Sequence, residues 1–279
     1  DGDFVRFRYG LPEKIGGWLQ LTAANKTLPG AARAQVAFSS FAGEKYSAIG
    51  TSQGLFLYYG NDFYDITPLD TAITGGTLTT VNNSNTITIN KGSHGLAAGR
   101  YITLSGVTVT GASGYTAADL EKVYEILTVP DVDKFTVQAA SVETGSGMTA
   151  AGAVTVNPYV EIGPTTQTTG FGWSTSTWNT STWGTARATS SVILDPGNWS
   201  LDNFGQVLVA TTNARTIRAS LTTTNFQTTN NPTASRFTLV SDRDRHLFHF
   251  GTETTIGDTT TQDPMFVRFS NQEDLNTYT

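Results

Sequence analysis

Three histidines are the side chains best suited to acid–base chemistry or metal binding in this sequence, and their spacing argues against both uses. His246 and His249 lie three residues apart within residues 245–250, whose alternation predicts a strand. Successive strand side chains point to opposite faces, so these two histidines cannot bind one metal ion together. His94 lies in the turn-like segment 92–96 with no second ligand nearby in sequence, and we expect it to cap a turn. We therefore predict no metal site.

The carboxylates form no recognisable catalytic or calcium-binding pattern. Glu121 and Glu125 would share a helical face, but Glu125 falls in a predicted strand. Two pairs of aspartates flank turns and lie outside any D-x-D-x-D-G calcium loop. Paired acids for glycoside hydrolysis can be distant in sequence, and the sequence neither supports nor excludes them. The two aspartate pairs are Asp131 with Asp133 and Asp242 with Asp244.

One segment formally matches a dinucleotide-binding fingerprint. Residues 145–150 fit G-x-G-x-x-A, a motif that needs a strand before it and a helix N-terminus after it to bind pyrophosphate. Residues 151–156 have no helical stripe, so we interpret the motif as a hairpin connection. The chain has no cysteine and therefore no thiolate nucleophile or cysteine zinc site. We predict no catalytic residue and no cofactor, and expect that the protein is not an enzyme.

The composition indicates an all-β protein. Charged residues make up 14% of the 279 residues, against roughly 25% in typical soluble proteins, and 28 glycines accompany many Thr, Ser and Asn residues. The net charge of −6 argues against a protein that holds nucleic acid by neutralising phosphates. No apolar stretch is long enough for a membrane span. The chain begins with Asp1, and we expect it to be processed or to be part of a longer chain.

Short strands recur along the chain. Residues 46–50 and 54–59 read as a hairpin, and a second turn leads to a strand over 63–68. The same pattern returns at 206–218 and at 245–250, an offset of about 37 residues, which is close to the blade length of repeat β-propellers. Evenly spaced strands also occur in sandwiches and barrels, so the repeat is propeller-like without excluding those folds. The residues expected in the blade cores are Ile49, Leu55, Leu57, Val207, Val209, Leu247 and Phe248.

The composition changes between residues 77 and 157, where aromatic residues become rare. We interpret 77–157 as an inserted small β-sandwich or barrel, and 1–76 with 158–279 as a β-propeller-like domain that is possibly incomplete. A helical turn is expected only at 117–122. The insert's alternating segments are 86–89, 101–104, 123–129, 134–137 and 153–156.

Two segments are candidate interaction surfaces. Trp173, Trp178 and Trp183 follow each other at intervals of five, which is neither a helical nor a strand period. They form either an ordered loop that packs on a neighbouring sheet or an aromatic platform for a sugar or a partner. Arg6 and Arg8 lie in a strictly alternating N-terminal strand. This strand is either an edge strand guarded by charge or a strand that docks on a neighbour.

Several segments resemble a known family. Residues 1–18 resemble a motif near the start of phage virion proteins that form the nozzle or hub of a short tail, the tail tubular protein B-like family. Residues 199–210 and 269–275 resemble further signatures of these proteins. Residues 94–99 and 134–137 are similar to a small β module that is common in phage tail proteins and has been likened to a half-domain of ubiquitin-activating enzymes.

The resemblance implies a β-propeller subunit that forms an axial ring with copies of itself, located in the virion. It would link the adaptor under the portal to the distal tail and contact other tail proteins such as fibres or a needle. Genomic DNA would pass through the channel without specific binding. Two alternatives from other classes remain. One is a receptor- or carbohydrate-binding tail protein that uses an aromatic surface, and the other is a glycan depolymerase on a propeller.

Overall fold

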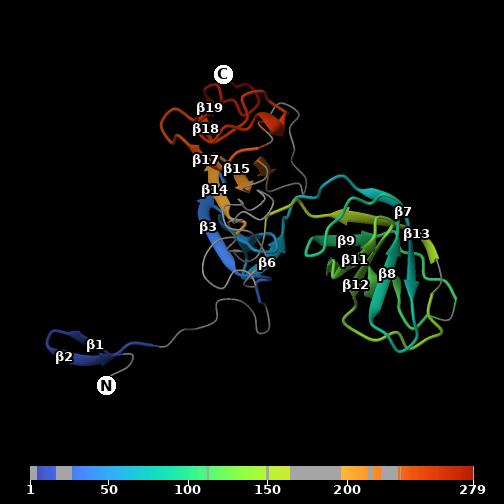
Figure 1. Ribbon diagram of the computed structural model, residues 1–279. Coiled ribbons are helices and arrows are strands. Elements are labelled where there is room, and N and C mark those ends of the chain that lie inside the picture. The colour runs from blue at the N-terminus through green and yellow to red at the C-terminus, as the bar shows by residue number, and fades with distance from the viewer. Residues whose placement is uncertain are drawn as a thin grey trace, which may run out of the picture.

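The chain folds almost entirely into antiparallel β-sheets, which confirms the all-β fold class. Within the described ranges, the only helices are α1 (Ala117–Leu120) and a 3-10 helix at Thr259–Thr261 (Figure 1). The computed structural model describes residues 5–16, 27–111, 113–148, 151–163, 196–212, 216–220, 232 and 234–278.

Three small sheets are antiparallel meanders, the blade-like units that the recurring strand pattern predicts. The first is made of β3 (Ala32–Ser39), β4 (Lys45–Thr51), β5 (Leu55–Tyr59) and β6 (Asp62–Asp65). The second is made of β14 (Trp199–Phe204), β15 (Val207–Thr212) and β16 (Thr216–Ser220). The third is made of β17 (Phe237–Val240), β18 (Leu247–Phe250) and β19 (Val267–Phe269).

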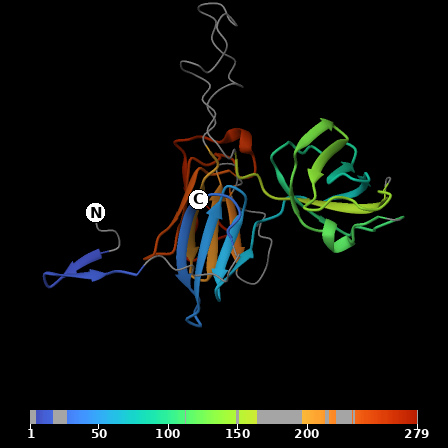
Figure 2. The ribbon, with the colours of Figure 1, turned by 90° about the horizontal axis from the view of Figure 1, so that it is seen from below.

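The second meander lies between the other two. Strand β14 packs against β3 and β4 on one side and against β17 on the other, so the three sheets form a stack. Figure 2 shows the strands of the first two sheets running side by side in this stack. Face-to-face stacking of twisted sheets buries an apolar layer about 10 Å thick between each pair.

Trp199 anchors the layer between the first two meanders. Its side chain is 4% exposed, and its indole nitrogen donates a hydrogen bond of 2.8 Å to the carbonyl of Thr51. Gly50 faces the ring, and a Cβ at this position would overlap the indole carbons. This close approach requires glycine at position 50. The buried members of this core are Phe38, Ala48, Leu55, Leu57, Val160, Ile162, Trp199, Leu208 and Ala210.

A seven-stranded sheet forms a separate unit beside the stack and curls around its own core (Figures 1 and 2). Its core residues come only from this part of the chain, between Leu78 and Val156, and include Phe135 with no exposed area. Its strands, in spatial order, are β10 (Val123–Glu125), β9 (Tyr101–Ser105), β13 (Ala151–Pro158), β7 (Ile73–Thr80), β8 (Thr86–Asn90), β12 (Lys134–Gln138) and β11 (Thr128–Asp131).

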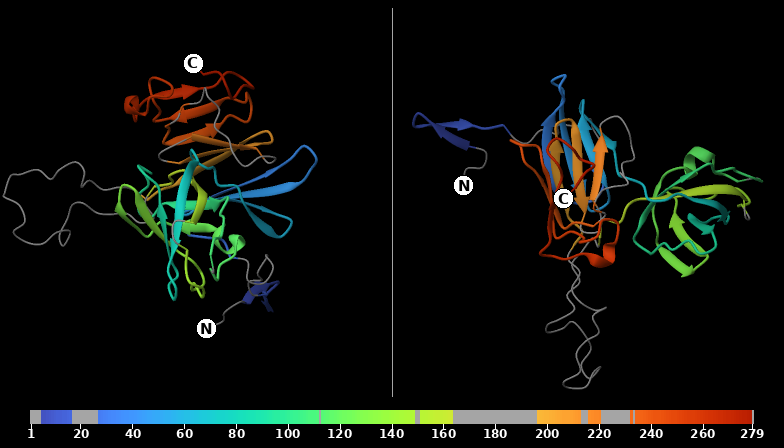
Figure 3. Two further views of the ribbon diagram at one scale, coloured as in Figure 1. Left: turned by 90° about the vertical axis from the view of Figure 1, so that its right-hand side faces the viewer. Right: turned by 90° about the horizontal axis from the view of Figure 1, so that it is seen from above.

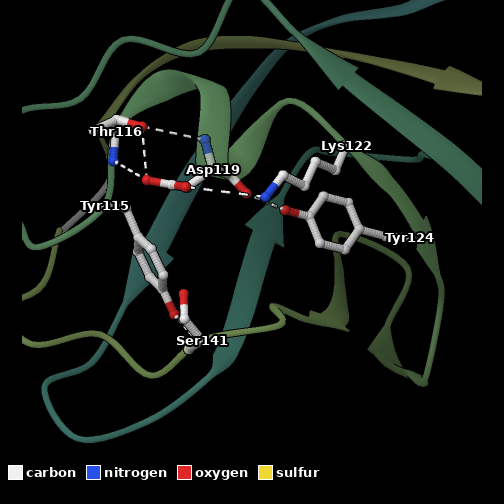
Figure 4. A network of polar contacts seen from close by, with 6 residues as sticks. All are labelled: Tyr115, Thr116, Asp119, Lys122, Tyr124 and Ser141. Carbon is white, nitrogen blue, oxygen red and sulfur yellow. Dashed lines mark hydrogen bonds and ion pairs between the residues drawn. The ribbon is translucent and has the colours of Figure 1, made fainter. Parts of the chain in front are cut away.

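The short helix α1 is fixed by its first turn. Thr116 and Asp119 form a capping box, in which the Thr116 hydroxyl accepts from the Asp119 backbone N–H while the Asp119 carboxylate accepts from the Thr116 backbone N–H (Figure 4). The Tyr124 hydroxyl donates to the Asp119 carbonyl at 3.0 Å and ties the helix to β10. The helical turn expected at 117–122 is therefore present.

Two antiparallel connections join the seven-stranded sheet to the stack. Leu69 and Tyr159 form a β-bridge, and the Asp70 N–H donates to the Pro158 carbonyl at 2.7 Å. Arg100 spans the same junction, because its guanidinium pairs with Asp70 at 2.7 Å. The chain thus leaves the stack and returns to it at adjacent points.

Candidate functional site

Residues 5–16 form an arm that projects from the rest of the molecule (Figures 1 and 3). The arm is a hairpin of β1 (Val5–Arg8) and β2 (Leu11–Lys14), and every residue from 5 to 16 is exposed. Tyr9 and Gly10 make the two-residue turn with φ of 52° and 79°, the backbone signs of a type I′ hairpin turn. The expected edge strand is present, because β1 pairs with β2 in a sheet of only two strands and its other edge is unpaired among the described residues.

Both faces of the arm combine charged and apolar side chains. Arg6 and Arg8 lie on one face, where the Arg6 Nε contacts Glu13 Oε2 at 2.9 Å. The Arg8 guanidinium lies over the Tyr9 ring, 5.5 Å from its centroid. Val5 and Phe7 lie on the other face, and Phe7 is 78% exposed. The register places Leu11 opposite Arg8 and Lys14 opposite Val5, so exposed apolar side chains lie beside charged ones on both faces, which suits a segment that lies on another surface.

The arm does not include the three tryptophans that were also predicted as an interaction surface. Trp173, Trp178 and Trp183 lie outside the described residues. Of the five residues predicted as an interaction surface, the structure describes only Arg6 and Arg8, and both lie on the arm.

An aromatic ledge runs along the end of the first meander. The rings of Phe38, Tyr46 and Tyr59 stack in sequence, with centroid distances of 5.7 Å and 4.8 Å. Both tyrosine hydroxyls donate to Glu44, at 2.5 Å from Tyr46 and 2.8 Å from Tyr59. These hydrogen bonds lower the pKa of Glu44, and the Glu44 bond raises the pKa of Tyr46 to about 12. Nothing in the spacing of these residues marks the ledge in the sequence.

His94 caps its turn, as its position in the sequence predicts. Its Nδ1 accepts a hydrogen bond of 3.0 Å from the Leu96 backbone N–H, and its ring meets the Phe135 ring edge-on at 5.0 Å. The Nε2 atom is buried without a hydrogen-bond partner among the described residues. A mainly apolar hollow of about 580 Å³ lies beside it and is also lined by Val129 and Val132. Because Nε2 is itself shielded, His94 is placed to hold the turn and not to act on a molecule in the hollow.

His246 and His249 lie on opposite faces of the third meander. His246 packs against the rings of Phe248 and Phe269, while the buried His249 contacts the Ser235 hydroxyl through Nδ1 at 3.0 Å. In the part of the chain that the structure describes, no group of three or more His, Cys, Asp or Glu side chains is arranged to hold a metal ion. His246 and His249 therefore have different surroundings and do not point toward one common ligand.

Residues 145–150 do not join a hairpin, so that interpretation is wrong. They follow β12 and precede β13, which are not neighbours in the sheet, because β12 pairs with β8 and β13 pairs with β7 and β9. A strand and not a helix follows the glycines, so the helix N-terminus that would bind pyrophosphate is missing at this position.

Glu143 is a buried carboxylate, and nothing in the sequence predicted its burial or its hydrogen bonds. It accepts hydrogen bonds from the backbone N–H groups of Gly114 and Gly145 and from the hydroxyls of Ser113 and Thr80, all between 2.5 and 2.9 Å. Burial acts to raise its pKa, but these four donors together outweigh burial and leave the pKa of Glu143 lowered. The Glu143 carboxylate thus connects the end of β7 with the segment at 113–114 and with its own loop at 143–145.

With this geometry in view, comparisons with known proteins add little. No family model and no curated protein matches the sequence. Among solved structures, the phage phi92 endosialidase is similar to 94% of this chain and 48% of its own, with 16% identity and a TM-score of 0.29. The chain thus spans about half the length of that protein. At this TM-score the likeness carries no argument about function.

None of the described helices is long and apolar enough to cross a membrane. The surface features that remain as candidates for function are therefore the arm and the aromatic ledge. The arm is exposed along its length, and the ledge runs from the buried Phe38 to the exposed Tyr59. Their geometry suits binding.

Proposed function

We propose that this protein is a structural subunit of a short phage tail, present as one copy in an axial ring that forms a nozzle or hub. The single observation that carries the proposal is the arm, residues 5–16. It is exposed along its whole length and falls within residues 1–18, the segment that resembles the opening of the nozzle family. The protein then acts by assembly and not by catalysis.

The arm has the physical character of an assembly element. An isolated two-stranded hairpin is marginally stable in water, so it needs a surface to lie on. Phe7, Tyr9 and Leu11 are 78%, 92% and 70% exposed. Large apolar side chains gathered on one exposed segment mark a site of protein–protein contact. A neighbouring copy in a ring supplies that surface.

The rest of the molecule fits the same role. The three stacked meanders would form the propeller-like body, residues 1–76 and 158–279, and residues 77–157 would form the inserted module. The net charge of −6 suits a channel wall past which DNA slides, because clustered basic residues would hold the phosphates. In the virion, the ring would contact the adaptor under the portal and the distal tail proteins.

The test is the state of assembly of the purified chain and of the particle. We expect light scattering after size exclusion to give a discrete oligomer, and electron microscopy to show rings with a central channel. Deletion of residues 5–16 should leave the far-ultraviolet circular dichroism spectrum of the body unchanged and abolish the ring. A chain that stays monomeric at high concentration, and that is absent from the tail axis in images of the particle, would overturn the proposal.

The aromatic ledge supports a second candidate function, glycan binding at the tail. Exposed tyrosine rings can stack on the apolar face of a sugar, and the Glu44 carboxylate keeps lone pairs for sugar hydroxyls beyond the two tyrosine bonds. A glycan array should then give a signal that Tyr59→Ala removes and that Phe237→Ala, a change of an exposed aromatic residue on the third meander, leaves intact. Particles with complete tails that fail only to adsorb would favour this function over the nozzle.

A further inference from the structure

The third meander carries an uncovered apolar face. The strand register places Phe237, Phe250 and Val267 in one row and Leu239, Phe248 and Phe269 in the next, all on the same side of the sheet. Their rings contact one another, for example Phe248 with Phe269 at 5.9 Å. Phe237, Leu239, Val267 and Phe269 are between 43% and 51% exposed. We call these six residues the outer face.

The opposite side of the same sheet is already buried in the stack. Leu247 has no exposed area, Val240 is 7% exposed, and Thr238 packs on the second meander through hydrogen bonds to Ser200 and Thr211. An antiparallel sheet with one buried face normally turns polar residues to water on its other face. Here the face turned away from the stack is apolar instead, so the outer face is built to be covered.

The outer face and the arm hold a large share of the molecule's exposed apolar side chains. Of the nineteen large apolar residues that are exposed in the described part of the chain, nine lie on these two surfaces. Both surfaces are β-structure, and sheets pack well against sheets. A contact between them would cover the outer face together with one face of the arm, where Val5 and Phe7 lie.

Their charges are also complementary. The arm carries Arg6, Arg8 and Lys14 against one acidic residue, Glu13. The segments that border the strands of the third meander are acidic, with more carboxylates than basic side chains. Opposite charges around an apolar contact steer association and fix its orientation. Besides the buried Glu253, the acidic residues on these segments are Asp242, Asp244, Asp258, Asp263, Glu273 and Asp274, against the basic residues Arg236, Arg243 and Arg245.

The two surfaces lie at opposite ends of the molecule. In Figure 1 and in the left view of Figure 3, the arm and the third meander occupy opposite ends of the picture. Two different patches that fit each other between copies make a heterologous contact, which builds a ring when the rotation between copies closes and an open filament when it does not. We propose that the outer face of one copy receives the arm of the next copy. This proposal rests on the proposed function as a ring subunit and names the surface that would build the ring.

The natural chain has no cysteine, which permits a direct test by disulfide cross-linking. One variant carries Phe7→Cys, a second carries Leu239→Cys, and the two are mixed and oxidised. We expect a cross-linked heterodimer between the two variants, formed well above the level of the matched control in which Val142→Cys replaces Leu239→Cys. Val142 is similarly exposed, at 48% against 46%, but lies in the seven-stranded unit.

A polar substitution gives an independent readout. Phe269→Glu on the outer face should reduce the ring to monomers in light scattering, while Val142→Glu should leave it intact. Circular dichroism shows whether each variant is folded. Should Phe269→Glu fail to fold, the cross-link between Phe7→Cys and Leu239→Cys decides alone.

The outcomes separate this proposal from the function on which it rests. Rings that form normally, without a cross-link above control, would overturn the docking of the arm on the outer face and leave the ring function standing. A chain that carries both cysteines and cross-links only within itself would show that the arm folds back on its own copy, which also overturns the proposal. Loss of both rings and cross-links would overturn the two together.

Discussion

The Tyr159 hydroxyl donates a hydrogen bond of 2.5 Å to Asp65 Oδ2, between residues 94 positions apart in sequence. This bond links the strand that leaves the seven-stranded sheet to the last strand region of the first meander. Asp65 also accepts from the Thr67 backbone N–H at 2.9 Å. The pair therefore fixes the junction at which the two units meet.

Tyr159→Phe should weaken this junction. The substitution removes the hydroxyl that donates to Asp65 and leaves the carboxylate without this hydrogen bond. We expect the free energy of unfolding to fall by about 1–2 kcal/mol. Chemical denaturation at pH 7 measures the loss. Tyr64→Phe is the control, because Tyr64 is 52% exposed and removal of its hydroxyl should change stability by less than about 0.5 kcal/mol. Equal effects of the two variants would contradict the role of the Tyr159 bond.

The same residue predicts a dependence on alkaline pH. Burial, together with the hydrogen bond and charge of Asp65, raises the pKa of Tyr159 above its ordinary value of 10.0. A raised pKa in the folded state means that this contribution to stability is complete below about pH 10 and is lost as the pH rises above it. The native chain should therefore lose more stability than Tyr159→Phe between about pH 9 and pH 11. Parallel pH profiles for the two proteins would contradict this.

Gly50→Ala should destabilise the layer between the first two meanders. The added methyl group would overlap the Trp199 ring, which is held in place by its bond to Thr51. Overpacking of this kind costs about 1–3 kcal/mol. Gly92→Ala is the matched control, because its nearest new contact would be an ordinary 3.5 Å to Asp133. The difference in melting temperature between the two variants measures the effect, which would be absent if Trp199 could move aside freely.

Glu143→Gln should destabilise the seven-stranded unit most strongly at neutral pH. The amide keeps one oxygen acceptor and brings an NH₂ group against donors, which costs about 2–4 kcal/mol. The lowered pKa of Glu143 means that its contribution is present above about pH 4.5 and is lost as the pH falls. The gap between native and variant stability should therefore shrink from pH 7 to pH 3. Denaturation curves across this range test the prediction, and a constant gap would contradict it.

Local features of the fold could be predicted from the sequence because they depend on neighbouring residues. Alternating side chains predicted the hairpin of β4 and β5, and the expected core residues Leu55, Leu57, Val209 and Leu247 are buried. Ile49, Val207 and Phe248 were expected in a core as well, but they are only half-buried, and Phe248 lies on the outer face. Alternation shows that a strand has an apolar face and does not show what covers it.

Features that depend on distant residues could not be predicted. The sheet order that separates β12 from β13 depends on long-range pairing, and the four donors to Glu143 come from three separate segments. Strand β2 was missed because Leu11–Lys14 contains Pro12 and has no alternating pattern. A turn with positive φ at Tyr9 and Gly10 reverses the chain, so that Leu11–Lys14 pairs with β1 and forms β2.

Two separate cores predict two unfolding transitions. The core around Phe135 and the core around Leu208 share no buried residue, and both side chains are fully buried. Phe135→Ala should cost about 3–5 kcal/mol and Leu208→Ala about 2–5 kcal/mol, through lost transfer energy and the cavity that remains. Calorimetry should then show each substitution lowering a different transition, because the described contacts between the units are confined to the junction around Leu69, Asp70 and Tyr159. If both substitutions lowered one shared transition, residues 77–157 would not be an independent module, and the junction at Tyr159 would couple the two cores into one cooperative unit.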